Sequence, residues 1–111
     1  MDIKHQIPSE CEIQTMVAIY DLSKKGISPA LSAIVDYLND TQGHNWKSQT
    51  VSTFIARLVK KGYVSSTREG RHIYHNCTMT KKEFLQKYLE YSAEILSNGD
   101  LEELRSVINE L

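Results

Sequence analysis

The sequence predicts a mainly α-helical protein with one small β-hairpin, and three observations support this fold class. Apolar residues recur at intervals of three and four along most of the chain, as on the buried face of a helix. Serine, threonine, aspartate and glycine stand where such helices would begin or end. Between two helical stretches, short segments rich in β-branched and aromatic residues flank a turn that contains glycine.

Length and composition limit the possible functions. The 111 residues, 41% of them apolar, suffice for one compact domain with a short appendage and are too few for a two-domain enzyme. No phosphate loop, nucleophile elbow or metal-ligand motif is present, so we expect neither an enzyme nor a cofactor. No apolar run could span a bilayer, and residues 1–7 lack the apolar stretch of a secretory signal, which predicts a cytoplasmic protein without membrane contact.

The first two predicted helices begin at capping signals. Ser9 and Glu12 have the spacing of a capping box, which opens the first helix, and Gly26 ends it. The second helix is expected to begin with Ser28 as the N-cap residue and Pro29 in the first turn, where the missing N–H of proline costs nothing.

The third predicted helix has one apolar and one polar face. It follows a turn at residues 39–45, extends from Lys47 or Ser48 to Lys61, and ends at Gly62. Its expected buried stripe consists of Val51, Phe54, Ile55 and Leu58.

A β-hairpin is predicted next. Residues 63–67 and 72–77 form its strands, and residues 68–71, which include Gly70, form its turn. Three helices closed by a hairpin correspond to the winged form of the helix-turn-helix. In that form the third helix enters the DNA major groove, and the hairpin, or wing, touches the adjacent backbone.

The total charge of −1 hides a strong asymmetry along the chain. Residues 47–71 carry six basic side chains and one acidic side chain, whereas residues 88–111 carry one basic and six acidic. Chance clustering on a solvated face is the alternative, but so large a swing in a small chain favours a localised anion-binding surface. A winged helix that binds DNA needs such a basic region, and one that binds only proteins does not.

Two groups of side chains are therefore expected to contact DNA, one at base edges and one at phosphates. Hydroxyl groups and a glutamine can reach base edges, and the base-reading candidates are Ser48, Gln49, Thr50 and Thr53. Cations position a protein on the backbone, and the phosphate candidates are Lys47, Arg57, Lys60, Lys61, Arg68 and Arg71. Lys60 and Lys61 also suit the carboxyl end of a helix dipole, and Arg57 could instead pair with an acidic residue of the domain. Trp46 is interpreted as a packing residue rather than a base-stacking one.

The last third of the chain predicts two more helices. Thr80 opens a helix that ends near Ser97, Asn98 and Gly99 break it, and Asp100 caps the last helix. Their apolar faces are wider than a three-helix core could cover, which favours a homodimer over the alternative of a ligand cavity. The expected interface residues are Phe84, Leu85, Tyr88, Leu89, Ile95, Leu96, Leu101, Leu104, Val107 and Ile108.

His72, His75 and Cys77 are competent metal ligands, but no metal site is expected from them. On a strand, His75 and Cys77 share one face while His72 points to the other, so the three do not converge. The other cysteine, Cys11, lies far away in sequence, and we expect both thiols to remain reduced.

Several stretches together resemble the penicillinase-repressor family of winged-helix regulators, which includes the β-lactamase, methicillin-resistance and copper-responsive repressors. The resemblance is carried by residues 46–51, 57–64 and 68–74, with further likeness at residues 7–16 and at the break after residue 97. It implies a winged-helix DNA-binding domain at residues 1–78 and a helical dimerisation region at residues 79–111. It further implies a homodimeric repressor that binds an inverted-repeat operator in double-stranded DNA and reads bases through Gln49, Thr50 and Thr53.

The sequence departs from that family's two known signals. No cysteine follows Cys77, so the paired cysteines of copper-responsive members are absent. Residues 90–99 contain no Asn-Phe pair, the bond at which a sensor protease cleaves antibiotic-responsive members. Two other assignments stay open on sequence grounds: a winged-helix regulator like the phenolic-acid or arsenic-type repressors, and a winged-helix module for protein binding.

Overall fold

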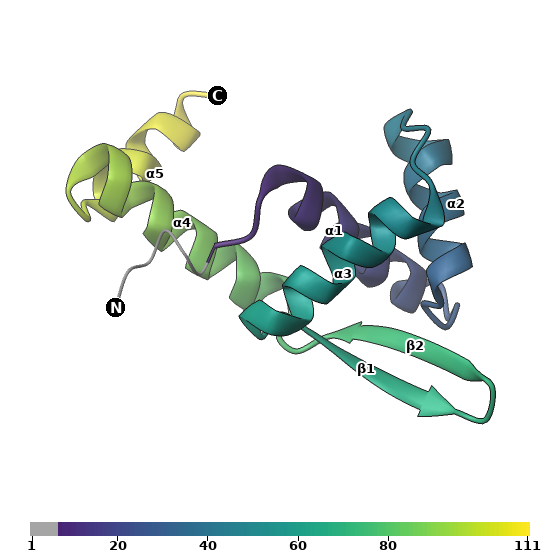
Figure 1. The fold of residues 1–111 in the computed structure, drawn as a ribbon. Helices are drawn as coiled ribbons and strands as arrows, with labels where there is room; N and C mark the ends of the chain where they lie inside the picture. The colour runs from purple at the N-terminus through teal and green to yellow at the C-terminus, as the bar shows by residue number, and fades with distance from the viewer. Residues whose placement is uncertain (1–6) are drawn as a thin grey trace. The chain divides into compact units, whose positions relative to one another are not determined.

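The computed structural model describes residues 7–111, which form five helices and one two-stranded antiparallel sheet (Figure 1). These residues belong to two compact units, Pro8–Thr78 and Met79–Leu111 with Ile7. The expectation that residues 1–7 lack a secretory signal falls almost wholly outside the described part. The first unit contains α1 (Glu10–Lys24), α2 (Leu31–Gln42), α3 (Ser48–Lys61), β1 (Val64–Glu69) and β2 (His72–Cys77), and the second contains α4 (Lys81–Ser97) and α5 (Leu101–Asn109).

This order of elements confirms the predicted fold class, and several helix ends lie where the sequence signals place them. Ser9 Oγ accepts the Glu12 N–H at 3.3 Å, and the Glu12 carboxylate accepts the Ser9 N–H at 3.4 Å, so the predicted capping box opens α1. The helix α3 begins at Ser48 and ends before Gly62, as expected.

The start of α2 differs from the prediction. The N-cap residue is Ala30, which has no side-chain cap, so Ser28 and Pro29 precede the helix. Instead, the Pro29 carbonyl accepts the backbone N–H of His75 at 2.9 Å, and Ala30 forms an isolated β-bridge with Tyr74. Pairing with the hairpin satisfies the backbone of this segment in an extended form, and this tertiary interaction outweighs the local capping signal.

The end of α2 also differs. Residues 39–42 continue the helix instead of forming the predicted turn, and Gly43 ends it in the left-handed conformation with φ of +68°. The Thr41 hydroxyl donates to the Tyr37 carbonyl at 2.6 Å within this last turn. Asparagine, aspartate and threonine favour turns but can also be accommodated in a helix. The helix ends at the glycine instead, because glycine adopts a positive φ without strain.

The core of the first unit lies between its three helices. Val51, Ile55 and Leu58 of α3 are buried as predicted, whereas Phe54 is half-buried. They pack with a set of buried side chains from the other elements: Met16 and Ile19 of α1, Ile34 and Leu38 of α2, and Tyr63 and Val64 after α3. Each such side chain contributes roughly 1.5–3 kcal/mol by burial. The outer face of α3 is consequently left to solvent.

The hairpin is a regular antiparallel pair from Val64↔Cys77 to Glu69↔His72. Its loop is only Gly70 and Arg71, so Arg68 and Glu69, expected in a four-residue turn, belong to β1. Gly70 has φ of +63°, which a tight two-residue loop requires. The wing is thus longer than predicted, with its two arginines still flanking the tip.

In the second unit, a capping box at Thr80 opens α4, and Asp100 caps α5 by accepting the Glu102 and Glu103 N–H groups at 3.0 and 3.3 Å. Asn98 ends α4 with φ of +51°. The chain reverses there, so α5 folds back against the last turns of α4 (Figure 1). No helix within residues 7–111 has the length and apolar character needed to cross a membrane.

A partly buried ion pair joins the start of α1 to the end of α3. Lys61 Nζ lies 2.6 Å from Glu12 Oε1, and the Glu12 side chain is only 3% exposed. Burial raises the pKa of Glu12, but the hydrogen bonds from Lys61 and Ser9 outweigh burial and hold it below its ordinary value of 4.5. The charged carboxylate therefore stabilises the fold.

Replacing Glu12 by Gln should lower the free energy of unfolding by about 1–3 kcal/mol, because Lys61 loses its charged partner. Urea denaturation followed by circular dichroism measures this, with the exposed Glu10→Gln as the matched control. The difference between wild type and Glu12→Gln should be full at neutral pH and shrink as pH falls below 4.5, since protonation removes the charge. Equal stabilities of the two variants at neutral pH would contradict this role.

Candidate nucleic-acid interface

The segment before α3 is held by five residues that we call the Trp46 cluster: Gln14, Asn39, His44, Trp46 and Phe54. The Asn39 side-chain amide donates to the Trp46 carbonyl at 3.0 Å, and its oxygen accepts the Trp46 N–H at 2.9 Å. The Trp46 ring stacks on His44 with centroids 3.6 Å apart and meets Phe54 edge-on at 5.1 Å. His44 Nε2 is in turn 2.6 Å from the Gln14 Oε1.

The Trp46 cluster ties the start of α3 to both preceding helices, because Gln14 belongs to α1 and Asn39 to α2. Trp46 thus packs within the unit, in line with its interpretation as a packing residue. Since these contacts fix the position of the first turn of α3, they also fix the direction in which its outer side chains project.

The four base-reading candidates lie together at the exposed start of α3. Ser48, Gln49, Thr50 and Thr53 are all exposed, as is Ser52 between them. The Thr53 hydroxyl donates to the Gln49 carbonyl at 3.0 Å, one helical turn back on the same exposed face. The face therefore offers hydroxyl and amide groups that can donate or accept hydrogen bonds.

Five of the six phosphate candidates are exposed with no ion pair among the described residues: Lys47, Arg57, Lys60, Arg68 and Arg71. The sequence leaves open that Arg57 pairs with an acidic residue of the domain. Within residues 7–111, however, Arg57 forms no ion pair. Arg68 Nε donates to the Gly70 carbonyl at 3.3 Å across the wing tip. The cations thus lie at both ends of α3 and at the tip of the wing.

Lys61 is placed differently from the other five cations. The Lys61 amine forms the ion pair with the Glu12 carboxylate, and the Lys61 side chain is 27% exposed. We therefore expect Lys61 to hold α3 against α1 rather than to meet a phosphate.

The wing carries the histidines and the cysteine considered as metal ligands. His75 Nδ1 is hydrogen-bonded to Ser66 Oγ at 2.8 Å, and burial lowers the pKa of the ring below 6.5. Burial raises the pKa of the Cys77 thiol to about 11, and its Sγ lies 3.9 Å from the Met16 carbonyl. The thiol is therefore protonated at neutral pH and is not an activated nucleophile. Residues 7–111 hold no group of three or more histidine, cysteine or acidic side chains placed to bind a metal.

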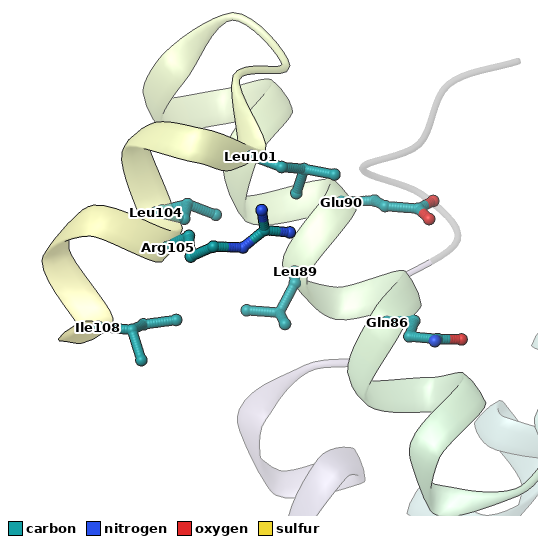
Figure 2. A pocket seen from close by; sticks show the side chains of 7 residues that line it. All are labelled: Gln86, Leu89, Glu90, Leu101, Leu104, Arg105 and Ile108. Carbon is teal, nitrogen blue, oxygen red and sulfur yellow. The ribbon is translucent and has the colours of Figure 1, made fainter.

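Most residues predicted for a dimer interface are exposed on α4 and α5. Their exposed fractions range from 37% at Tyr88 to 74% at Leu96, while Leu104 is half-buried and Phe84 is already buried. Figure 2 shows Leu89 of α4 facing Leu101, Leu104 and Ile108 of α5 across a groove of about 460 Å³, with Gln86, Glu90 and Arg105 as its polar lining.

A helical unit in which the third helix exposes hydrogen-bonding side chains beside a basic hairpin is a winged helix-turn-helix, a class of nucleic-acid-binding proteins. The comparison with protein families narrows this class. The family described as penicillinase repressor matches residues 8–110, nearly the whole chain, and the chain therefore belongs to the penicillinase repressor family. This is a family of DNA-binding transcription regulators and not of enzymes.

Solved structures from this family are similar to the chain. One is the solution structure of the monomeric form of Bacillus licheniformis BlaI in complex with the blaP half-operator. It is 25% identical, with a TM-score of 0.55 over 69% of this chain and 87% of that one. Another, the DNA-binding domain of the repressor BlaI, is also 25% identical, with a TM-score of 0.54 over 68% of this chain and 84% of that one.

A curated relative is an uncharacterised 16.5 kDa protein of Latilactobacillus sakei, in the ptsI 3′ region. It is 36% identical over 42 residues, which are 38% of this chain. The match spans 29% of the length of that relative.

Sequence reasoning did not identify Glu12 and Asn39 as positioning residues. The spacing from Ser9 indicates only a capping role for Glu12, and the composition around Asn39 predicts a turn. The partner of Glu12 is 49 residues away and that of Asn39 is seven residues away across a loop, so neither pairing has a periodic signal.

Replacing Asn39 by Ala should destabilise the first unit by about 1–2 kcal/mol, because two backbone groups of Trp46 lose their partners. It should also speed amide hydrogen exchange in the first turn of α3 more than in α1. The control is Asn45→Ala, which removes an exposed amide from the same loop. Exchange rates at Thr50 and Val51 that match the control would show that Asn39 does not hold α3.

Proposed function

We propose that the chain is a transcriptional repressor that binds an inverted-repeat operator as a homodimer. The observation that carries this proposal is the exposed start of α3, where four hydrogen-bonding side chains project from a helix flanked by cations that form no ion pair within residues 7–111. In a winged helix this face enters the major groove. A DNA partner also agrees with the cytoplasmic location that the sequence suggests.

The side chains of α3 and the wing would have two separate tasks. Gln49 can pair with adenine through its amide, and Ser48, Thr50 and Thr53 can reach base edges at close range. Lys47, Arg57, Lys60, Arg68 and Arg71 would contact phosphates, which fix the register of the protein and carry no base code. The complex of Bacillus licheniformis BlaI with a half-operator supports this arrangement, since it pairs a similar fold with DNA.

The homodimer is proposed from the second unit. Its helices expose a row of leucine, isoleucine and valine side chains, and α5 has no buried residue in the single chain. An apolar surface of this kind is unfavourable in water unless a partner covers it. A two-fold dimer would present two α3 helices about one DNA turn or a multiple apart, which predicts an inverted repeat.

Replacing Thr50 by Ala should cost about 1–3 kcal/mol on an operator selected from random DNA and much less on random DNA, because only base contacts distinguish sequences. Replacing Arg68 by Ala should weaken binding to the operator and to random DNA alike. It should also lower the steepness with which log K falls against log of the salt concentration by about 0.9, as expected for one lost phosphate contact. Electrophoretic or anisotropy titrations over a range of salt measure both effects. Equal losses on the two DNAs for Thr50→Ala would contradict base reading.

Replacing both Leu101 and Leu104 by Glu should produce monomers and reduce operator affinity by at least about a hundredfold, because the two half-sites are no longer bound together. Sedimentation equilibrium gives the oligomeric state. Leu111→Glu is the control, since Leu111 is 98% exposed at the end of the chain. A Leu101/Leu104 variant that remains dimeric would place the interface elsewhere.

A further inference from the structure

The side chains that project furthest from the core of α3 follow from the position of its buried stripe. That stripe repeats at intervals of four and three residues, from Val51 through Ile55 to Leu58. Two residues turn an α-helix by about 200°, so the side chains two positions before the members of the stripe point almost directly away from the core. They form what we call the α3 ridge, which consists of Gln49, Thr53 and Ala56, with Lys60 one turn further on.

The middle of the α3 ridge consists of two small side chains. Thr53 and Ala56 lie between the long side chains of Gln49 and Lys60, and all four residues are exposed. Long, flexible side chains at the ends of the ridge can extend along a surface that the helix meets, whereas small ones in the middle leave the helix backbone free to approach it. The ridge therefore comes closest to a bound surface at Thr53 and Ala56.

The Thr53 hydroxyl is turned back onto the helix, where it donates to the Gln49 carbonyl at 3.0 Å. A hydroxyl group has a single proton, so while this hydrogen bond holds it can only accept from a ligand. The Thr53 side chain carries one other group on its Cβ atom, a methyl. Because the residue is exposed, this methyl group is the part of Thr53 that remains for a ligand.

The middle of the α3 ridge thus presents two methyl groups side by side. Residues three positions apart on a helix have Cβ atoms about 5–6 Å from one another, so Thr53 and Ala56 are neighbours on its surface. The floor of the DNA major groove consists mostly of hydrogen-bonding groups, and among the bases only thymine carries a methyl group there. Threonine and alanine methyl groups are suited to contact with it.

We propose that Thr53 and Ala56 recognise the 5-methyl group of a thymine near the middle of each operator half-site. The proposal rests on the proposed function and names a base and a chemical group that it would read. It gives Thr53 an apolar role in place of a hydrogen-bonding one. It also adds Ala56, a residue whose type carries no signal for base reading in the sequence, to the residues that determine specificity.

The first test removes the methyl group from the DNA and leaves its hydrogen-bonding groups unchanged. Each thymine in one half-site of an operator selected from random DNA is replaced in turn by 2′-deoxyuridine, and affinity is measured by fluorescence anisotropy. At one thymine, or at two neighbouring ones, the affinity should fall about three- to fivefold, as expected for one buried methyl group. A selected half-site without a constant thymine, or one insensitive to every replacement, would overturn the proposal.

The second test removes one group at a time from Thr53. Thr53→Ser keeps the hydroxyl and removes the methyl, whereas Thr53→Val keeps a methyl and removes the hydroxyl, and the three residue types have similar helix propensities. Thr53→Ser should weaken operator binding about three- to fivefold. Thr53→Val should stay within about twofold of wild type, since the methyl group is retained. The opposite order of the two variants would assign a hydrogen bond to the hydroxyl and overturn the proposal.

Combining the two changes shows whether the two methyl groups touch. If they form one contact, replacement of the sensitive thymine by 2′-deoxyuridine should weaken binding of Thr53→Ser by less than about 1.5-fold, because that contact is already lost. Thr53→Val should remain as sensitive to the replacement as wild type. A loss in Thr53→Ser equal to that in wild type would place the thymine methyl against another side chain and overturn the role of Thr53.

The third test enlarges the middle of the α3 ridge. Ala56→Leu should weaken operator binding by at least about tenfold, because the larger side chain holds the helix away from the bases. Ser23→Leu adds the same side chain at an exposed position of α1 and should change the affinity less than about twofold. Circular dichroism checks that both variants are folded. Equal affinities of the two variants would overturn the placement of Ala56 at the point of closest approach.

The same titrations separate the failure of this proposal from the failure of the proposed function. Wild type that binds the selected operator and random DNA equally well would refute base reading altogether, and both proposals with it. Operator-specific binding that withstands removal of the methyl group from every thymine and from Thr53 would refute only the methyl contact.

Discussion

The division of α3 into a buried and an exposed face is the constraint on which the winged-helix unit depends. Val51, Ile55 and Leu58 are almost wholly buried, and burying them leaves Gln49 and Thr50 no position other than the opposite, exposed face. The helix cannot rotate without bringing a polar side chain into the core, which would cost several kcal/mol. The functional surface is therefore a consequence of the packing of the core.

Two polar interactions at the ends of α3 complete its placement. The Trp46 cluster holds the start of the helix, and the Glu12–Lys61 ion pair holds its end against α1. Hydrophobic burial is not directional, so it fixes which face is inside but leaves small rotations and shifts along the axis. Hydrogen bonds with defined geometry remove that freedom, which matters for a helix that must place side chains against base edges.

The sequence predicted the parts of the fold that depend on neighbouring residues. Capping boxes at Ser9 and Thr80, the stripe of α3 and the composition of the hairpin are local signals, and all agree with the structure. The start of α2 was predicted wrongly because the hairpin captures Pro29 and Ala30, an interaction between segments some 45 residues apart. The Glu12–Lys61 pair has no signal in the sequence for the same reason, since residue types at a large separation carry no period.

The central claim is that the exposed start of α3 meets DNA bases. Its most direct test is an NMR titration of the isotope-labelled full chain with a duplex selected from random sequences. We expect the largest backbone and side-chain shift changes at residues 48–53, with smaller changes at the wing tip and none of comparable size on the buried faces of α1 and α2. Saturable binding with α3 unperturbed, and shifts confined to another surface, would contradict the account.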